Sequence, residues 1–205
     1  MRTITGLFDA YDDASSAVRS LKDAGIPSDD ISIVANNSDG SYGSEHDRDS
    51  DVTESAGAGA GIGAVVGGAG GLLAGLGALA IPGVGPVVAG GWLLATAIGA
   101  VTGAAVGGAT GGIIGALEDA GVEERDAHVY AESVRRGGAL VTARVDDSRV
   151  DAAQAILRGG SGVDIDSRRR QYEDEGWKGF DESADPYSPD QVRDYRSTIV
   201  PPMIR

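Results

Sequence analysis

The sequence predicts an α+β fold, in which two short βαβ units form one four-stranded sheet interrupted by an apolar, glycine-rich helical hairpin. Charged residues are absent from residues 56–117, where 21 of 62 residues are Gly and 16 are Ala. All 17 basic and 31 acidic residues therefore fall outside this window. On either side of it, short β-rich runs alternate with amphipathic helical patterns that end at glycine. The chain thus combines an acidic α+β part with an uncharged insert.

The first βαβ unit is expected in residues 1–35. Residues 3–8 are a short β-rich run, and Asp9 offers a helix N-cap. Apolar residues then follow at helical spacing up to Gly25, which ends the helix. Residues 31–35 are expected to form the second strand.

The second βαβ unit is expected in residues 118–170. Apolar residues at i, i+3, i+4 and i+7 predict an amphipathic helix over 127–134. Residues 139–145 alternate in polarity and are expected to form a strand. A helix over 148–157 and a last strand over 163–167 complete the unit.

Small residues recur every four positions in the insert, on both sides of a Pro- and Gly-rich turn at 82–86. This repeat places them on one helical face, where two backbones can approach closely. Each Gly costs a helix about 1 kcal/mol relative to Ala, so tight packing is needed to hold arms at 56–81 and 87–117. We therefore expect helix packing and oligomerisation through Gly59, Gly63, Gly67, Gly71, Gly75, Gly91, Ala95, Gly99, Gly103, Gly107, Gly111 and Gly115.

The expected partners are further copies of the chain and a lipid membrane. At 1.5 Å per residue the two arms would reach about 39 and about 46 Å, which suffices for a ~30 Å hydrocarbon core. Residues 1–6 contain no apolar run typical of a signal peptide, so we expect a cytoplasmic membrane location with the α+β part in the cytoplasm. However, Gly and Ala are weakly hydrophobic and the flanks are acidic. The alternative is therefore a cytoplasmic oligomer with a buried zipper, and Trp92 is either an interfacial anchor or a packing residue.

Several function classes are disfavoured. The net charge of −14 argues against nucleic-acid binding, and the absence of Cys excludes thiol catalysis and thiolate metal sites. The G-x-G-x-x-A pattern at 59–64 does not directly follow a strand, so no nucleotide cofactor is expected. We predict no enzyme and no catalytic, cofactor-binding or metal-binding residue. His128 is expected to be a surface or packing residue, and Arg135–Arg136 and Arg168–Arg170 are expected on solvated faces or at anionic lipid headgroups.

Two polar segments flank these units. Residues 36–55 are rich in Ser and Asp and are interpreted as an acidic linker. Residues 171–205 form an acidic tail with scattered aromatic and Pro residues. This composition favours disorder, although the aromatic side chains could also dock on the domain or on a neighbouring subunit.

The chain resembles the bacterial general stress protein domain, also described as heat-induced stress protein or general stress protein 17M type. The matching stretches are Thr-Ile-Thr-Gly-Leu-Phe-Asp at 3–9, Ala-Gly-Ile-Pro-Ser-Asp-Asp-Ile at 24–31, and the helix and glycine-to-strand junction at 127–141. The resemblance covers 1–35 and 118–168. It implies a ferredoxin-like sandwich, stress-linked expression and no established enzymatic activity. The insert resembles glycine-zipper segments of small bacterial membrane proteins.

Together these patterns predict a non-enzymatic general stress-response protein that oligomerises through a glycine-zipper hairpin in association with a membrane. A soluble oligomeric scaffold that buries the zipper is one alternative. A small-ligand sensor that uses the ferredoxin-like sheet is another.

Overall fold

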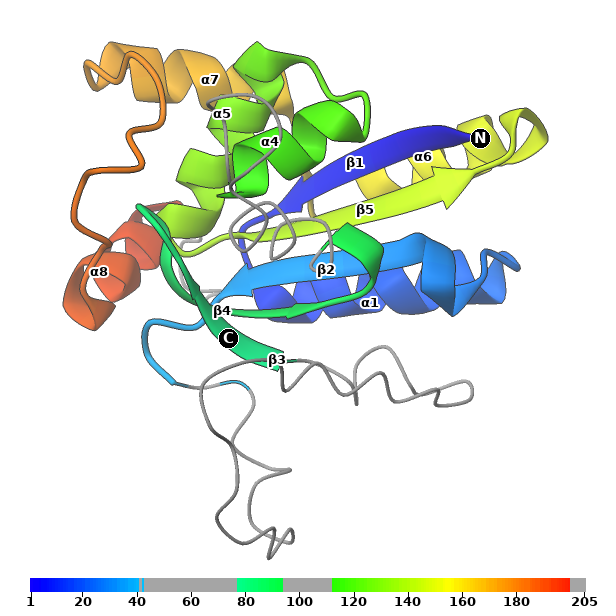
Figure 1. Ribbon diagram of the computed structural model, residues 1–205, viewed down its shortest axis with the longest axis horizontal. Helices are drawn as coiled ribbons and strands as arrows, with labels where there is room; N and C mark the ends of the chain where they lie inside the picture. The colour runs from blue at the N-terminus through cyan, green and yellow to red at the C-terminus, as the bar shows by residue number, and fades with distance from the viewer. Residues whose placement is uncertain (41, 43–76, 94–111, 200–205) are drawn as a thin grey trace, which may run out of the picture.

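A six-stranded antiparallel sheet with helices on both faces forms the framework of the protein (Figure 1). The computed structural model describes residues 1–40, 42, 77–93 and 112–199. The expected α+β class is confirmed.

The sheet combines strands that are distant in sequence. Its order is β3 (Gly77–Ile81), β4 (Gly85–Gly90), β2 (Ile31–Asn36), β5 (Ala139–Val145), β1 (Arg2–Phe8) and β6 (Gly162–Val163). The central strand β5 lies between β1 and β2 and pairs antiparallel with both along most of its length. The sheet therefore cannot form without residues from both sides of the glycine-rich window.

Two helices cover one face of the sheet. These are α1 (Tyr11–Asp23), between β1 and β2, and α6 (Val150–Arg158), between β5 and β6. Val18 and Leu21 of α1 and Leu157 of α6 pack with Phe8 and Ile33 in one apolar cluster. The amphipathic spacing predicted for these two helices is confirmed, with boundaries shifted by one to three residues.

The opposite face is covered by α4 (Gly112–Asp119) and α5 (Glu124–Arg135). Leu117 and Val134 pack there on Val34 and Leu140, whose side chains alternate with those that face α1. Because both faces are covered, all six residues of β2 are buried. This explains why β2 is a continuous apolar run rather than an alternating one.

The same glycine motif ends α1 and α4. After each helix the Gly lies in the left-handed region, with φ of 80° at Gly25 and 89° at Gly121. The Ile26 N–H donates to Leu21 O, and the Val122 N–H donates to Leu117 O. These bonds satisfy carbonyls that a helix end leaves free. The predicted stop at Gly25 is thus confirmed, and Gly121 ends α4 in the same way.

The predicted turn at 82–86 is present, but the helical arms on either side of it are wrong for residues 77–81 and 87–90, which belong to strands β3 and β4. Four-residue glycine spacing led us to expect helices up to Ile81 and from Val87. Instead, Gly83 and Gly85 adopt φ of 71° and 96° in a tight turn, which favours a β-hairpin. Val87 enters the core, and β4 pairs with β2. Tertiary pairing therefore decides the structure here, and the remainder of the insert (residues 56–76 and 94–111) lies outside the described residues.

The expected strand over 163–167 is confirmed only at Val163 and is wrong for 165–167, which are helical. Strand β6 ends at Val163, and the Asp164 carboxylate accepts the Ser167 N–H at 2.8 Å, which caps α7 (Ile165–Asp174). An Asp N-cap starts a helix because it satisfies an N–H that the first turn leaves free. The β-prone Val163 and Ile165 concealed this signal in the sequence.

The tail is folded over most of its length, contrary to the expected disorder. It contains the end of α7 and a further helix, α8 (Pro189–Ile199). Tyr172, Phe180 and Val192 are buried, so its apolar residues dock on the domain. Residues 200–205 lie outside the described part of the chain, as do 41 and 43–55 of the acidic linker. Asn36, assigned to that linker, is the last residue of β2.

Among the described residues, none of the helices combines the length and the apolar character that a membrane crossing requires.

Candidate functional site

The predicted oligomerisation residues are divided between described and undescribed parts of the chain. Gly91 and Gly115 are described. The other predicted positions lie outside the described residues: Gly59, Gly63, Gly67, Gly71, Gly75, Ala95, Gly99, Gly103, Gly107 and Gly111. Gly115 lies in α4 and is partly exposed. The structure therefore places one predicted glycine on a helix and one beside the sheet.

Gly91 serves close packing within the chain. It follows β4 with a φ of 92°. A Cβ at this position would overlap Ile31 O and would lie 2.5 Å from Ser32 Oγ. Only Gly combines this backbone conformation with such an approach. The neighbouring Leu93 N–H donates to the same Ser32 Oγ at 2.8 Å, so the chain after β4 is fixed to the start of β2.

A polar cluster closes this end of the sheet. The Arg144 guanidinium forms an ion pair with Asp30 at 3.0 Å and lies 4.7 Å from the centre of the Trp92 ring. The Trp92 Nε1–H donates to Asp30 O at 3.3 Å. Of the two roles considered for Trp92, the structure therefore shows a packing residue, half-buried over Arg144.

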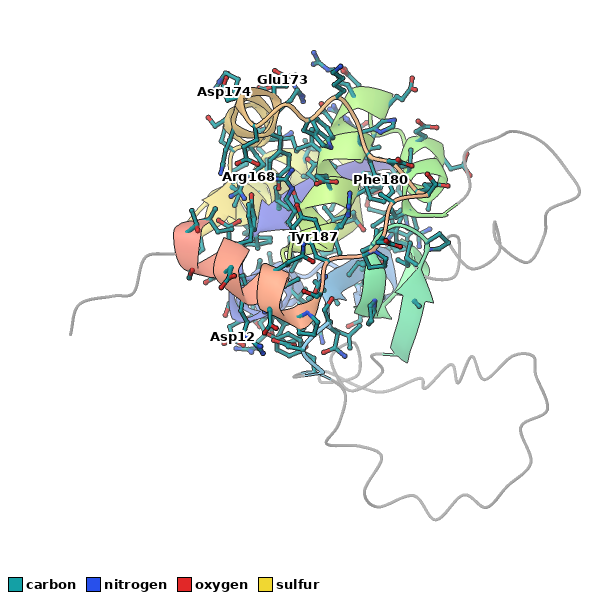
Figure 2. The ribbon with its side chains drawn as sticks, turned by 90° about the vertical axis from the view of Figure 1, so that its left-hand side faces the viewer. Asp12, Arg168, Glu173, Asp174, Phe180 and Tyr187 are labelled. Atoms are coloured by element: carbon teal, nitrogen blue, oxygen red, sulfur yellow. The ribbon has the colours of Figure 1, made fainter. Side chains whose placement is uncertain are left out.

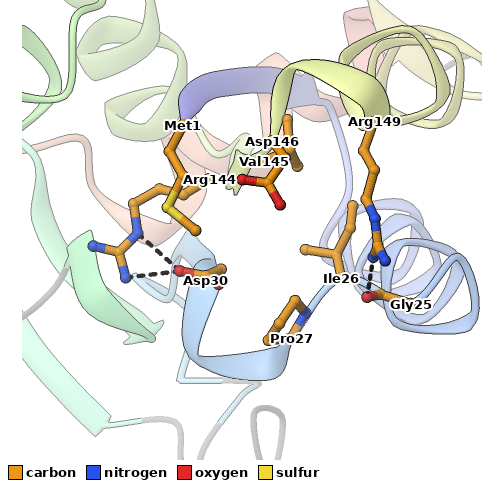
Figure 3. A pocket seen from close by; sticks show the side chains of 9 residues that line it. All are labelled: Met1, Gly25, Ile26, Pro27, Asp30, Arg144, Val145, Asp146 and Arg149. Atoms are coloured by element: carbon orange, nitrogen blue, oxygen red, sulfur yellow. Dashed lines mark hydrogen bonds and ion pairs between the residues drawn. The ribbon is translucent and has the colours of Figure 1, made fainter.

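A small cavity of about 140 Å³ adjoins this cluster (Figure 3). Its lining combines Met1, Pro27 and Asp146 with the ion pair of Arg144 and Asp30. Arg149 closes the far side by donating to Gly25 O. Figure 3 shows both guanidiniums already engaged by groups of the chain. The cavity therefore offers few uncommitted donors to a ligand.

A second cavity, of about 230 Å³, lies beside β1 where β6 ends. Thr5, Tyr130, Arg158 and Ile165 are among its lining residues. Burial raises the pKa of the Tyr130 phenol well above its usual range, so this phenol stays protonated at neutral pH. Thr5 Oγ1 is buried without a hydrogen-bond partner among the described residues.

Two buried arginines, Arg136 and Arg168, hold the C-terminal tail on the domain, which corrects the expectation that they are solvated, whereas Arg170 is exposed as expected. The Arg168 guanidinium forms an ion pair with Asp9 at 2.7 Å and donates to Tyr195 Oη at 3.2 Å. Arg136 is bound by Glu132 at 2.6 Å and by Glu175. Burial alone would lower the pKa of Arg136, but the hydrogen bonds to these two carboxylates outweigh it and raise the pKa.

The two arginines share a tyrosine. The Arg136 guanidinium lies 4.1 Å from the centre of the Tyr172 ring, and Arg168 lies 5.9 Å from it. The Tyr172 hydroxyl is 3.0 Å from Ser133 Oγ, so α7 is connected to α5. Burial raises the pKa of Tyr172 far above its usual range. Each of these side chains interacts with another group of the chain, as is typical of a structural contact.

The rest of the tail crosses α5 and the β3–β4 hairpin. Figure 2 shows α8 across the near face of the molecule and the connecting segment passing Tyr187 and Phe180. Phe180 belongs to the apolar cluster under α4 and α5, and its N–H donates to His128 Nδ1 at 3.1 Å. His128 is therefore a packing residue, one of the two roles expected for it.

Metal-ligating side chains do not cluster in the part of the chain that the structure describes. No group of three or more His, Asp or Glu side chains converges there in a way that could hold a metal ion. The chain has no Cys. The carboxylates of Asp9, Asp30 and Glu132 are each paired with an arginine.

Residues 3–80 match the family model described as the heat induced stress protein YflT domain. This match covers 78 of the 205 residues and supports the resemblance to the general stress protein domain. No match was found among the curated proteins or among the solved structures. The resemblance noted at 3–9 and 24–31 is thereby confirmed.

The YflT match includes β1, α1, β2 and most of β3, but it ends before β5. Since β5 separates β1 from β2, the matched residues form a sheet only together with residues 139–145. The resemblance over 118–168 is not covered by the YflT match. The structure nevertheless joins that segment to the YflT residues in one sheet.

Proposed function

We propose that this chain is a non-enzymatic general stress-response protein that self-associates through its two glycine-rich segments. The YflT match supports the stress-response role. The rows of small residues, every four positions in uncharged sequence, support the self-association. These rows are the observation on which the proposed assembly depends.

We also propose that the domain bearing these segments is ferredoxin-like. The strands β2, β5, β1 and β6 are neighbours in this order, and all pairs are antiparallel. Helix α1 connects β1 to β2, and α6 connects β5 to β6, with both helices on one face. Such split βαβ units are the elements of the ferredoxin-like arrangement. The hairpin β3–β4 then extends the sheet beyond β2.

The small-ligand sensor has less support. Pockets for small molecules usually enclose about 300–1,000 Å³, whereas the two cavities described above enclose about 140 and 230 Å³. Both sheet faces are filled by apolar side chains from the helices and the tail. A ligand as large as a typical metabolite would have to displace some of these side chains.

The proposed self-association is tested by placing leucines either on the glycine rows or one position beside them. Gly67→Leu with Gly107→Leu places two leucines on the rows, whereas Gly68→Leu with Gly108→Leu places them one position away. The two variants have the same composition. We expect only the first to lower the molar mass measured by light scattering on the full chain. Equal masses for both variants and the unmodified protein would refute the proposal.

Membrane association is the second part of the proposal, with a soluble scaffold as its alternative. The full chain is mixed with vesicles of anionic phospholipid and sedimented. Sedimentation with the vesicles that survives a carbonate wash supports association, and its loss in the Gly67→Leu, Gly107→Leu variant would link it to the rows. Protein that stays in the supernatant as an oligomer would establish the soluble scaffold.

A further inference from the structure

The outer edge of β1 is paired with another described strand over only part of its length. Strand β6 pairs with Leu7 and Phe8 alone. Residues 2–6 therefore have a strand partner on the β5 side and none among the described residues on the other. Figure 1 shows the N-terminal half of β1 at the rim of the sheet, beside α6. An unpaired edge of this kind is a template for another strand.

The cavity of about 230 Å³ lies in line with the missing strand. Thr5, Gly6 and Leu7 line it from β1, and Val163 and Asp164 line it where β6 gives way to α7. Apolar side chains from Leu157 and Ile165 also contribute to its wall. A strand that continued the line of β6 would thus place a side chain at the mouth of this cavity.

We propose that a second copy of this chain adds its β1 to this edge, so that two sheets join across a two-fold axis. The pairing is antiparallel and places Thr3 opposite Thr3 of the partner copy. Arg2 then lies opposite Ile4, and Met1 lies opposite Thr5. A register shifted toward Gly6 would make the incoming strand overlap Asp164, because Asp164 follows Val163 along the direction of β6.

The side chain of Met1 fits this arrangement. Among the described residues, Met1 is the large hydrophobic residue that is exposed, at 78%. Residues 1, 3, 5 and 7 of a strand project to one face, and Leu7 identifies this face as the one covered by α5. In the proposed register Met1 lies opposite Thr5 of the other copy, and its side chain turns from the first cavity, which it lines in the single chain, to the second. Burial of an exposed methionine stabilises an interface because it removes apolar surface from water.

Charge complementarity also favours a second copy as the occupant. Arg2 is exposed and forms no ion pair with a described residue. In the proposed register it lies two strand positions from Asp164 of the other copy, on the same face, which is about 7 Å along the strand. At the rim of the cavity Asp166 is paired with Arg169 at 2.9 Å, whereas Asp164 forms no ion pair with a described residue. One added guanidinium per copy gives Asp164 a cationic partner.

Cross-linking by a single cysteine tests the register. The natural chain has no Cys, so Thr3→Cys introduces one thiol per copy. Paired residues of antiparallel strands have Cα atoms about 4.5–5.5 Å apart, which lies within the range that a disulfide spans. Under mild oxidation of the full chain at micromolar concentration, we expect Thr3→Cys to form disulfide dimers about 100-fold faster than a variant with a cysteine outside the interface.

The control is Ser16→Cys, an exposed position on α1 away from the edge. Cross-linking of Thr3→Cys no faster than that of Ser16→Cys would overturn the proposal. In an otherwise natural background, Arg2→Asp is expected to raise the dimer dissociation constant by at least about tenfold, and Arg2→Lys to leave it within threefold. Equal dissociation constants for the two variants would also overturn it, and Arg2 is exposed, so neither variant should unfold.

This interface is independent of the proposed glycine assembly. Residues 1–5 belong to the described domain, whereas Gly67 and Gly107 do not. The Gly67→Leu, Gly107→Leu variant is therefore expected to cross-link through Cys at position 3 at an unchanged rate. Failure of either proposal alone can thus be distinguished from failure of the other.

Discussion

Neutralising Glu132 should destabilise the protein, because Glu132 is a buried carboxylate partner of Arg136. The Glu132 side chain is 2% exposed, and its two oxygens bind Arg136 at 2.6 Å and Arg135 at 3.4 Å. Glu132→Gln keeps the volume and one acceptor but removes the negative charge. Arg136 is then left in a buried site with Glu175 as its remaining carboxylate.

The size of this effect follows from the burial of the pair. Removing one partner of a buried ion pair usually costs about 3–5 kcal/mol. Glu175 and the retained amide oxygen place Glu132→Gln at the lower end, at about 3 kcal/mol. For a chain of 150–250 residues, each kcal/mol lowers Tm by about 2–4 °C. The expected decrease in Tm is therefore about 6–12 °C, measured by calorimetry or circular dichroism.

A double-mutant cycle separates the ion pair from a general loss of packing. Arg136→Met removes the other charge, and the double variant leaves neither charge buried. We expect the free energy of unfolding lost in the double variant to be smaller than the sum of the two single losses by about 0.5–3 kcal/mol. Glu173→Gln on the exposed side of α7 is the control, with an expected change within about 0.5 kcal/mol. A Glu132→Gln loss no larger than this control, or strict additivity in the cycle, would refute the reasoning.

Two further predictions concern the close approach after β4 and the docking of the tail. Gly91→Ala should lower the free energy of unfolding by at least about 2 kcal/mol, because Gly91 has a φ of 92° and an added Cβ would overlap Ile31 O. The loss is measured by urea titration. A loss below about 0.5 kcal/mol, which is the size of a neutral surface change, would show that the contact relaxes freely. Phe180→Ala should cost about 3 kcal/mol if the segment after α7 unfolds together with the domain, because Phe180 is buried in the cluster under α5. The backbone N–H at position 180, which donates to His128 in the natural chain, should then lose protection from hydrogen exchange in this variant. Unchanged protection would contradict the docking.

The sequence was sufficient where local pattern and tertiary environment agree. Strand β5 was predicted with its observed bounds, because β-prone residues follow directly on the Gly137–Gly138 break. Helix α1 and the glycine stops after it were predicted for the same reason. In these segments the periodicity of apolar residues, the capping residues and the buried face all favour one structure.

The strands at 77–90 could not be inferred from the glycine period. Gly83 and Gly85 continue the high glycine content of the insert, but here they serve a tight turn with positive φ. The informative signals were Pro82 before Gly83, and the β-branched pair Val87–Val88. These signals are local and weak, whereas the pairing of β4 with β2 that decides the structure joins residues more than 50 positions apart.

The burial of the arginines depends on partners that no local pattern reveals. Arg168 belongs to a basic triplet that reads as a solvated face, yet its carboxylate partner, Asp9, is 159 positions away. Arg136 is bound by Glu132 on its own helix, which the i,i+4 spacing could have indicated. Its burial, however, requires Tyr172 of α7. The sequence therefore indicates the pair of Glu132 and Arg136, but not the contact with Tyr172 that keeps the tail folded.

The hairpin β3–β4 changes what the glycine-rich sequence can do. A single helical hairpin over 56–117 would leave the domain once and return once. Because β4 pairs with β2, the chain instead returns to the sheet at Gly77 and leaves it again after Leu93. Leu93 and Ile113, on either side of residues 94–111, belong to the same apolar cluster. Assembly through the glycine rows therefore has to be compatible with a segment whose two ends are held on one domain.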